Sequence, residues 1–171
     1  NYDLLFTNIK SMEDIEIIKQ YALFSNKSIE YIQEKIQNFK TLNSKDFGKY
    51  SNHQEFYELS KTYIFDLLSA NTSHKAVKDK LSRFIPNFFD IIDRHPGTSF
   101  LEFGGGLGVL TEIIKTDLNM DVTYVDIKGH ISDFAMWRFK EYNININCHI
   151  IPQDKIPLTE HYDVIFTDAV I

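Results

Sequence analysis

The sequence is poor in cysteine, proline and glycine, and it contains no long apolar run. Its one cysteine, Cys148, excludes a disulfide within these 171 residues and a cysteine-rich metal site. No apolar run approaches the roughly 20 residues that a membrane-spanning helix needs. The first residues lack the basic and apolar segments of a signal peptide. We therefore expect a reducing, cytoplasmic setting without membrane attachment, with Cys148 as an inert side chain in a buried strand.

Basic charge is also scarce. Eighteen Lys and Arg residues stand against 24 Asp and Glu residues, which gives a formal net charge of −6 and a pI near 5.5. Such a chain has no general attraction for nucleic acid or anionic membranes, so we expect a small-molecule substrate and no nucleic-acid partner. The 43% of hydrophobic residues suffices for one core of ordinary size, with room for a small appended domain.

Residues 1–95 contain Gly48 and Pro86 as their only glycine and proline, and they carry helical periodicity. The pattern predicts an all-helical N-terminal region over 1–95, acting as a lid or as the contact of a homodimer. Ser28 is placed to cap one of its helices. The polar segment 43–51, which includes Gly48, predicts a loop.

A further helix is expected to carry Phe56 and Leu67 on one apolar face, after that loop. This half of the chain is rich in Phe and Tyr, and packing between helices accounts for most of them. Three aromatic side chains near the loop are candidates for lining a substrate site: Tyr50, His53 and Tyr57.

From residue 96 to residue 171 strands and helices alternate. This alternation predicts an α/β fold with a Rossmann-like parallel sheet and right-handed crossovers, in a second unit that spans 96–171. The expected helices cover 107–115 and about 132–142. The expected strands cover 99–103, 122–126, 147–151 and 163–167.

The glycine cluster that follows the first expected strand organises this second half. Phe100 to Phe103 is a short apolar run, and a helix-competent segment begins at Leu107. Gly104 can take the positive φ of a sharp strand-to-helix turn. Gly106 leaves room for a ligand at the backbone, and Gly108 lets the helix lie close to the strand. The helix N-terminus then offers free N–H groups and a positive dipole end.

Two cofactor classes use such a turn. The dinucleotide fingerprint G-x-G-x-x-G fails here, because its third position falls on Val109. The spacing is instead Glu102-x-Gly104-x-Gly106-x-Gly108, and a second strand ends at Asp126. This arrangement resembles motif I and the ribose-binding acid of the Rossmann-like S-adenosylmethionine-dependent methyltransferases.

The resemblance implies a set of cofactor-binding residues. The turn would hold the methionine part of the cofactor, Asp126 the ribose hydroxyls, and Ile127 the adenine; a solvent-exposed strand end is the alternative for Asp126. Gln153 or Asp154 would lie near the adenine amino group, although the sequence there departs from the family's Gly-Asp pattern and a solvated loop is an equal alternative. The implied residues are Glu102, Gly104, Gly105, Gly106, Gly108, Asp126, Ile127, Gln153 and Asp154.

The segment from Tyr162 to Asp168 resembles motif IV of the same family. Asp168 has three possible roles: a helix cap, a general base, or a ligand of a divalent cation as in the catechol and caffeoyl-CoA O-methyltransferases. No further metal ligand can be identified, so no metal is assigned. The Asn-Pro-Pro-Tyr signature of enzymes that methylate DNA bases or protein glutamine is absent here.

The resemblance thus implies an S-adenosylmethionine-dependent methyltransferase that acts on an O or N acceptor of a small molecule and releases S-adenosylhomocysteine. The family sheet has more strands than the four seen here, so we expect the sequence to end before that sheet is complete. Two alternatives stay open. One is an NAD-dependent Rossmann oxidoreductase, and the other is a non-catalytic scaffold with a methyltransferase-like fold.

Overall fold

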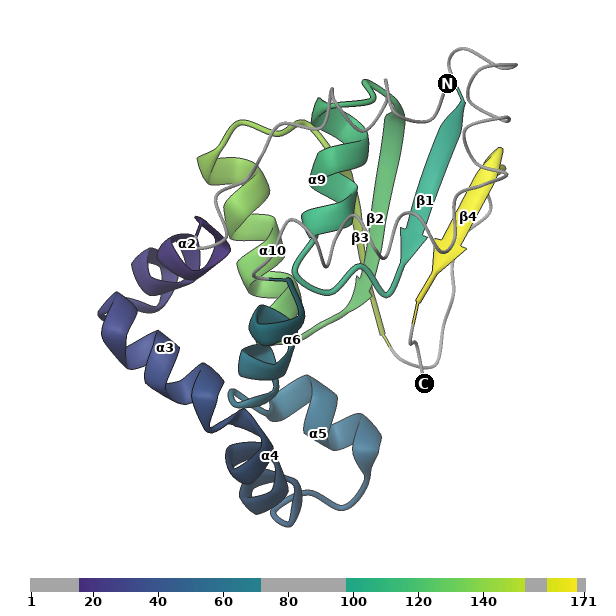
Figure 1. The fold of residues 1–171 in the computed structure, drawn as a ribbon. Coiled ribbons are helices and arrows are strands. Elements are labelled where there is room, and N and C mark those ends of the chain that lie inside the picture. Colours follow the sequence, from purple (N-terminus) through teal and green to yellow (C-terminus); the bar gives the residue numbers. More distant parts are fainter. Residues whose placement is uncertain (1–15, 72–97, 153–159, 169–171) are drawn as a thin grey trace.

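The structure is a computed structural model that describes residues 16–71, 98–152 and 160–168 (Figure 1). Residues 16–71 form helices joined by short loops, with no strand in that range. The helical character predicted for the N-terminal region is therefore confirmed over 16–71. Its helices are α2 (Glu16–Ser25), α3 (Ile29–Gln37), α4 (Phe39–Phe47), α5 (His53–Leu59) and α6 (Tyr63–Asn71).

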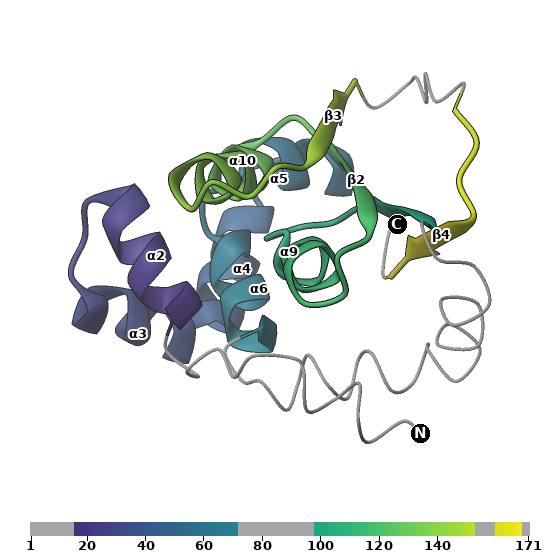
Figure 2. The same ribbon diagram turned by 90° about the horizontal axis from the view of Figure 1, so that it is seen from above.

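A parallel four-stranded sheet follows, with the strand order β3-β2-β1-β4. This is the order of the first four strands of a Rossmann-type sheet, so the predicted fold class is confirmed. Figure 2 shows α9 and α10 on one face of the sheet, with α2 and α3 beyond them, and Figure 1 shows α4 and α5 below the carboxyl ends of the strands. The elements are β1 (Ser99–Phe103), α9 (Val109–Thr116), β2 (Asp121–Ile127), α10 (His130–Glu141), β3 (Asn147–Ile151) and β4 (Val164–Thr167).

The prediction of a loop over 43–51 was wrong, because α4 continues to Phe47. The polar residues of this segment form a solvent-facing side, but Asp46 is buried. Its carboxylate accepts hydrogen bonds from Ser60 Oγ at 2.6 Å and from Lys49 Nζ at 2.9 Å. The buried Asp46 carboxylate, paired with these two donors, therefore stabilises the end of α4. The sequence of this segment is too polar for its periodicity to predict a helix.

The single helix expected through Phe56 and Leu67 is instead two helices that meet at Ser60. The Ser60 hydroxyl accepts hydrogen bonds from the backbone N–H groups of Thr62 and Tyr63, at 3.1 and 3.3 Å. A serine side chain that captures these amides starts a new helix rather than continuing the old one. Ser28 caps α3 as predicted, since Tyr31 N donates to Ser28 Oγ at 3.2 Å.

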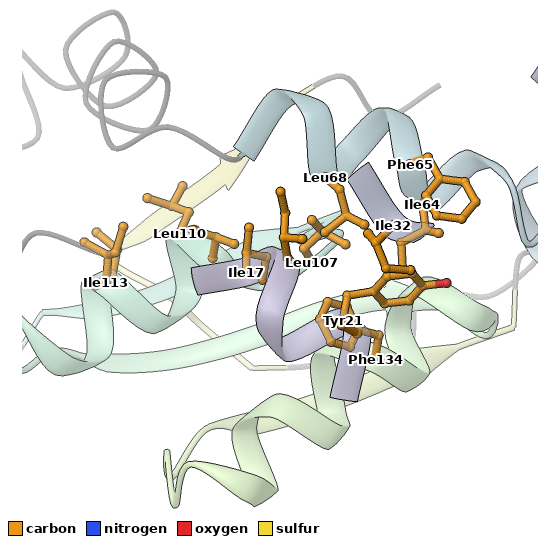
Figure 3. Close-up of a cluster of buried hydrophobic side chains, with 14 of the residues drawn as sticks. Ile17, Tyr21, Ile32, Ile64, Phe65, Leu68, Leu107, Leu110, Ile113 and Phe134 are labelled. Carbon is orange, nitrogen blue, oxygen red and sulfur yellow. The ribbon is translucent and has the colours of Figure 1, made fainter. Parts of the chain in front are cut away.

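One apolar core joins the helical region to the sheet (Figure 3). Side chains from α2, α3 and α6 pack against the turn after β1, against α9, and against Phe134 of α10. The helices therefore bury their apolar faces on the same layer that covers the sheet. The labelled members of this cluster are Ile17, Tyr21, Ile32, Ile64, Phe65, Leu68, Leu107, Leu110, Ile113 and Phe134.

Two expectations from composition concern the membrane and Cys148. Within the described ranges, no helix has both the length and the apolarity to cross a membrane. Cys148 is half-buried on β3 and packs beside Tyr124 and Phe139. Burial raises the pKa of its thiol, which keeps the thiol protonated and disfavours a nucleophilic role.

The shared core predicts a large stability loss on truncation of α6. Ile64 is 0% exposed, so Ile64→Ala should lower the free energy of unfolding by about 2–5 kcal/mol through lost burial and a residual cavity. The measurement is urea denaturation. Leu59→Ala on neighbouring α5 is the control, because Leu59 is 57% exposed and its loss should change stability by no more than about 0.5 kcal/mol. Equal effects of the two substitutions would contradict this view of the core.

Candidate functional site

The site is built on the glycine turn, defined here as residues 104–108 between β1 and α9. Gly104, Gly106 and Gly108 have φ values of 73°, 56° and 70°, which favour glycine. The backbone N–H groups of Gly104 and Gly105 both donate to Val125 O, at 2.8 and 3.2 Å. The turn therefore stays attached to β2 while the chain leaves the sheet.

Side chains of other elements fill the space beside two of these glycines. A Cβ at Gly105 would lie 2.5 Å from Tyr124 Cε2, and a Cβ at Gly108 would lie 2.4 Å from Phe139 Cζ. Gly108 therefore does allow a close approach, as predicted. The element that approaches it is α10, however, and not the strand. The first helical turn of α9 can begin only where these two aromatic rings leave room.

Gly106 is covered by the helical region. A Cβ at this position would lie 3.7 Å from Leu67 Cδ1 of α6, which is ordinary van der Waals contact. Gly106 is therefore needed for its positive φ, and the predicted free space beside it is in part taken by Leu67. The backbone of the turn and α6 lie directly against each other.

Asp126, near the end of β2, bonds directly to the glycine turn. Its Oδ2 accepts hydrogen bonds from Gly106 N at 2.7 Å and from Tyr124 Oη at 3.2 Å, and its Oδ1 accepts one from Ile127 N at 2.7 Å. Burial raises the pKa of Asp126, while these hydrogen bonds act in the opposite direction. This end of the strand is partly buried, since two backbone N–H groups hold the carboxylate and the Tyr124 hydroxyl lies within reach of it.

Tyr124 belongs to the same arrangement, and sequence reasoning missed it. The side chain is fully buried, and its hydroxyl donates to Gly106 O at 2.8 Å as well as lying within reach of Asp126. Burial raises the pKa of Tyr124 well above its ordinary value, so the hydroxyl keeps its proton. The signal was available, since residues two apart on a strand share one face of the sheet.

Glu102 supports the turn from below. It is 3% exposed, and its Oε2 accepts a hydrogen bond from Thr111 Oγ1 in the first turns of α9. The same Oε2 would lie 3.4 Å from a Cβ at Gly105. The carboxylate therefore fixes α9 relative to β1, next to the turn, and its predicted part in cofactor binding stays a prediction.

The end of α5 closes over the neighbouring loop between β2 and α10. A Cβ at Gly129 would lie 3.0 Å from Glu58 O and 3.4 Å from Tyr57 O. The Tyr57 and Tyr63 rings lie 4.7 Å apart between centroids. Together with the contact at Gly106, this arrangement places α5 and α6 on both loops of the carboxyl edge.

Tyr63 is the first residue of α6, and its ring packs against Tyr57 of α5. Burial, and then the proximity of Tyr57, Asp66 and Asp126, raise the pKa of Tyr63 to about 12. A tyrosine with this pKa stays neutral near pH 7 and can donate a hydrogen bond.

Of the three aromatic candidates, Tyr57 lies near this edge through its backbone carbonyl, while its ring packs 5.5 Å from Phe56 between centroids. Tyr50 and His53 pack instead in a cluster of rings, with Tyr50 5.7 Å from Phe56 and His53 4.6 Å from Phe47 between centroids. Their surroundings are those of side chains that pack helices together.

Strand register positions the last site residues. Phe103 pairs with Thr167, so Asp168 follows β4 at the same edge where Gly104 follows β1. The side chain of Ile127 packs with Val125 and Ile151 in a cluster separate from the main core.

Two other predictions concern Gln153, Asp154 and a metal. Gln153 and Asp154 lie outside the described residues. No group of three or more possible metal ligands occurs within the described ranges.

No family model and no curated protein matches the sequence. Two methyltransferases are among the solved structures that resemble the fold. An S-adenosylmethionine-dependent methyltransferase from Clostridium acetobutylicum is 17% identical, with a TM-score of 0.38, over 54% of this chain and 41% of the other. Coclaurine N-methyltransferase, bound to N-methylheliamine and S-adenosylhomocysteine, is 16% identical, with a TM-score of 0.43, over 97% of this chain and 52% of the other. The chain spans about half or less of these proteins, and at such scores they carry no weight for its function.

The packing of the turn predicts different outcomes at two glycines. Gly108→Ala should lower the free energy of unfolding by about 1–3 kcal/mol, because the added methyl meets Phe139 and the residue has a positive φ. Gly48→Ala is the control, since Gly48 has a φ of −64° and no atom within 4 Å of an added Cβ. Urea denaturation compares both variants with the wild type. A neutral Gly108→Ala would contradict the packing described here.

Proposed function

We propose that the protein is an S-adenosylmethionine-dependent methyltransferase that transfers a methyl group to an O or N acceptor of a small molecule. The observation that carries this proposal is the hydrogen bond from Gly106 N to Asp126 Oδ2. It joins a glycine turn after the first strand to an acid at the end of the second. Ligands of open parallel sheets bind at this edge, where the strand order reverses.

The donor set at this edge fits the proposed cofactor. Within the described residues, Asp126 Oδ1 accepts a single hydrogen bond, and a carboxylate oxygen has two lone pairs. Asp126 therefore has acceptor capacity for a ribose hydroxyl. The N-terminus of α9 at Gly108 supplies the partial positive charge that suits the carboxylate of the methionine part.

Methyl transfer requires mainly that the acceptor and the methyl group be aligned. When bound, S-adenosylmethionine supplies an activated methyl group. The chain then has to orient the acceptor in line with that group, which is a proximity effect. Asp168 is positioned at the end of β4, beside the turn, where a base could take a proton from an O or N acceptor.

Features of the turn and the net charge disfavour the two alternatives, an NAD-dependent oxidoreductase and a non-catalytic scaffold. The third position of the dinucleotide fingerprint is Val109, a buried residue within α9. A scaffold without cofactor would not require a turn with three positive φ values next to a partly buried acid. The acidic net charge favours a small-molecule acceptor over nucleic acid. The homodimer contact and the cytoplasmic location stay predictions.

Titration calorimetry with S-adenosylmethionine, S-adenosylhomocysteine and NAD tests the proposal. We expect both adenosyl ligands to bind and NAD not to bind. Asp126→Ala should weaken S-adenosylhomocysteine binding by about 1.5–3 kcal/mol, the usual worth of hydrogen bonds to a charged acceptor. Asp121→Ala, an exposed acid at the other end of β2, is the control and should bind normally. Selective binding of NAD would support the oxidoreductase, and binding of neither class would support the scaffold.

Asp168→Asn separates three roles of the last acid. Asparagine still caps a helix, so a capping role predicts near-normal methyl transfer. A general base predicts a large loss of rate with unchanged S-adenosylhomocysteine affinity, and this is the outcome we expect. A metal ligand predicts a loss that depends on Mg²⁺, with a wild type that EDTA inhibits. Normal turnover of the variant would remove Asp168 from the catalytic residues.

A further inference from the structure

Arg138 of α10 is a fully buried charged side chain outside the site described above. It is 0% exposed, and its guanidinium reaches three different elements. Nε donates to Gln20 Oε1 at 2.6 Å, and Nη1 donates to Leu107 O at 2.5 Å. Nη2 forms an ion pair with Glu112 of α9.

These partners belong to elements that are far apart in the sequence. Gln20 is itself 4% exposed and lies on α2, which Figure 1 shows beside α10. Leu107 lies in the middle of the glycine turn, between Gly106 and Gly108. A single guanidinium therefore connects an N-terminal helix to the backbone that we propose binds the cofactor.

The cost of breaking this arrangement is high in physical terms. A buried charge that loses one partner keeps its desolvation penalty without the compensating hydrogen bond. Arg138 cannot give up its proton, because the guanidinium stays charged in proteins. When Gln20 is absent, the side chain must therefore move toward another acceptor or admit water, and either change disturbs its bond to Leu107 O.

Leu107 itself is held in two ways, through its carbonyl by Arg138 and through its side chain by the core. The glycines on either side have φ values of 56° and 70° and no side chains to pack. The Leu107 side chain is 3% exposed and lies in the core that α2 and α6 share with α9 (Figure 3). Both the carbonyl and the side chain of Leu107 thus depend on the helices that precede the sheet.

We propose that Gln20 and Arg138 are positioning residues of the glycine turn, through which α2 sets the affinity of the cofactor site. This inference rests on the proposed function, since the affinity in question is that for S-adenosylhomocysteine. Neither residue touches the cofactor in this account. Arg138 holds the Leu107 carbonyl, and Gln20 holds Arg138.

The test uses two substitutions at Gln20 in the full protein. Gln20→Leu keeps an apolar contact between α2 and the core but removes the acceptor of Arg138 Nε. It should raise the Kd for S-adenosylhomocysteine by about tenfold, measured by calorimetry at a temperature where the variant is fully folded. Gln20→Glu restores an acceptor and should return the Kd to within about threefold of wild type.

Tyr21→Phe is the matched control. Tyr21 is equally buried on α2, and its hydroxyl also bonds to α10, through His130 Nε2 at 2.9 Å. A merely structural role of the α2–α10 contact predicts that both variants melt at lower temperature and both keep wild-type Kd values. We expect Tyr21→Phe to keep its Kd within about twofold, unlike Gln20→Leu. Equal Kd values for the folded Gln20→Leu and Tyr21→Phe proteins would overturn the inference.

A second measurement separates this inference from the proposed function. Amide hydrogen exchange at Gly106 and Gly108 should be faster in Gln20→Leu than in Tyr21→Phe, with no ligand present. If wild type fails to bind S-adenosylhomocysteine but this difference appears, the proposed function fails and the coupling of α2 to the turn stands. If wild type binds and the exchange rates are equal, the coupling fails instead. Arg138→Lys, which keeps the charge but loses the planar fork, is the second variant should Gln20→Leu not fold, and it should show the same changes.

Discussion

The chain between Gly104 and Gly108 must leave the sheet and begin a helix with positive φ at three of its five residues, and the surrounding structure depends on that constraint. Glycine permits such a backbone but does not select it, because glycine loses more conformational entropy than other residues on ordering. Selection therefore comes from neighbours. Val125 O accepts two amides of the turn, and Asp126 accepts a third.

The neighbours act in two ways: they form hydrogen bonds with the backbone of the turn, and they fill the space that side chains in the turn would need. Tyr124 bonds to Gly106 O, and its ring occupies the space that a side chain at Gly105 would need. Arg138 bonds to Leu107 O, while Phe139 blocks a side chain at Gly108. A conformation held from both sides in this way tolerates local strain, as binding sites commonly do. Residues of β2 and α10 therefore determine the conformation of the turn together with its glycines.

The sequence predicted the elements whose signals are local. Apolar runs bounded by glycine or polar residues located all four strands, and the first and third have the predicted bounds. The errors arose where a distant partner decides the structure. Asp46 is buried because Ser60, 14 positions away, donates to it, and periodicity in a polar segment cannot reveal such a bond. Arg138 and Gln20, 118 positions apart, escaped notice for the same reason.

The helical region has a physical consequence for any ligand at the carboxyl edge. Leu67 contacts the turn, and the end of α5 contacts Gly129, so these helices lie on both loops that flank Asp126. A ligand bound over Asp126 would therefore meet α5 and α6 as well as the loops of the sheet, and hydrogen bonds made in such partly buried surroundings are stronger than those in water. If the proposed methyl transfer takes place at this edge, α5 and α6 would help to fix the reacting groups, because protein dipoles held in place would then replace mobile solvent around them.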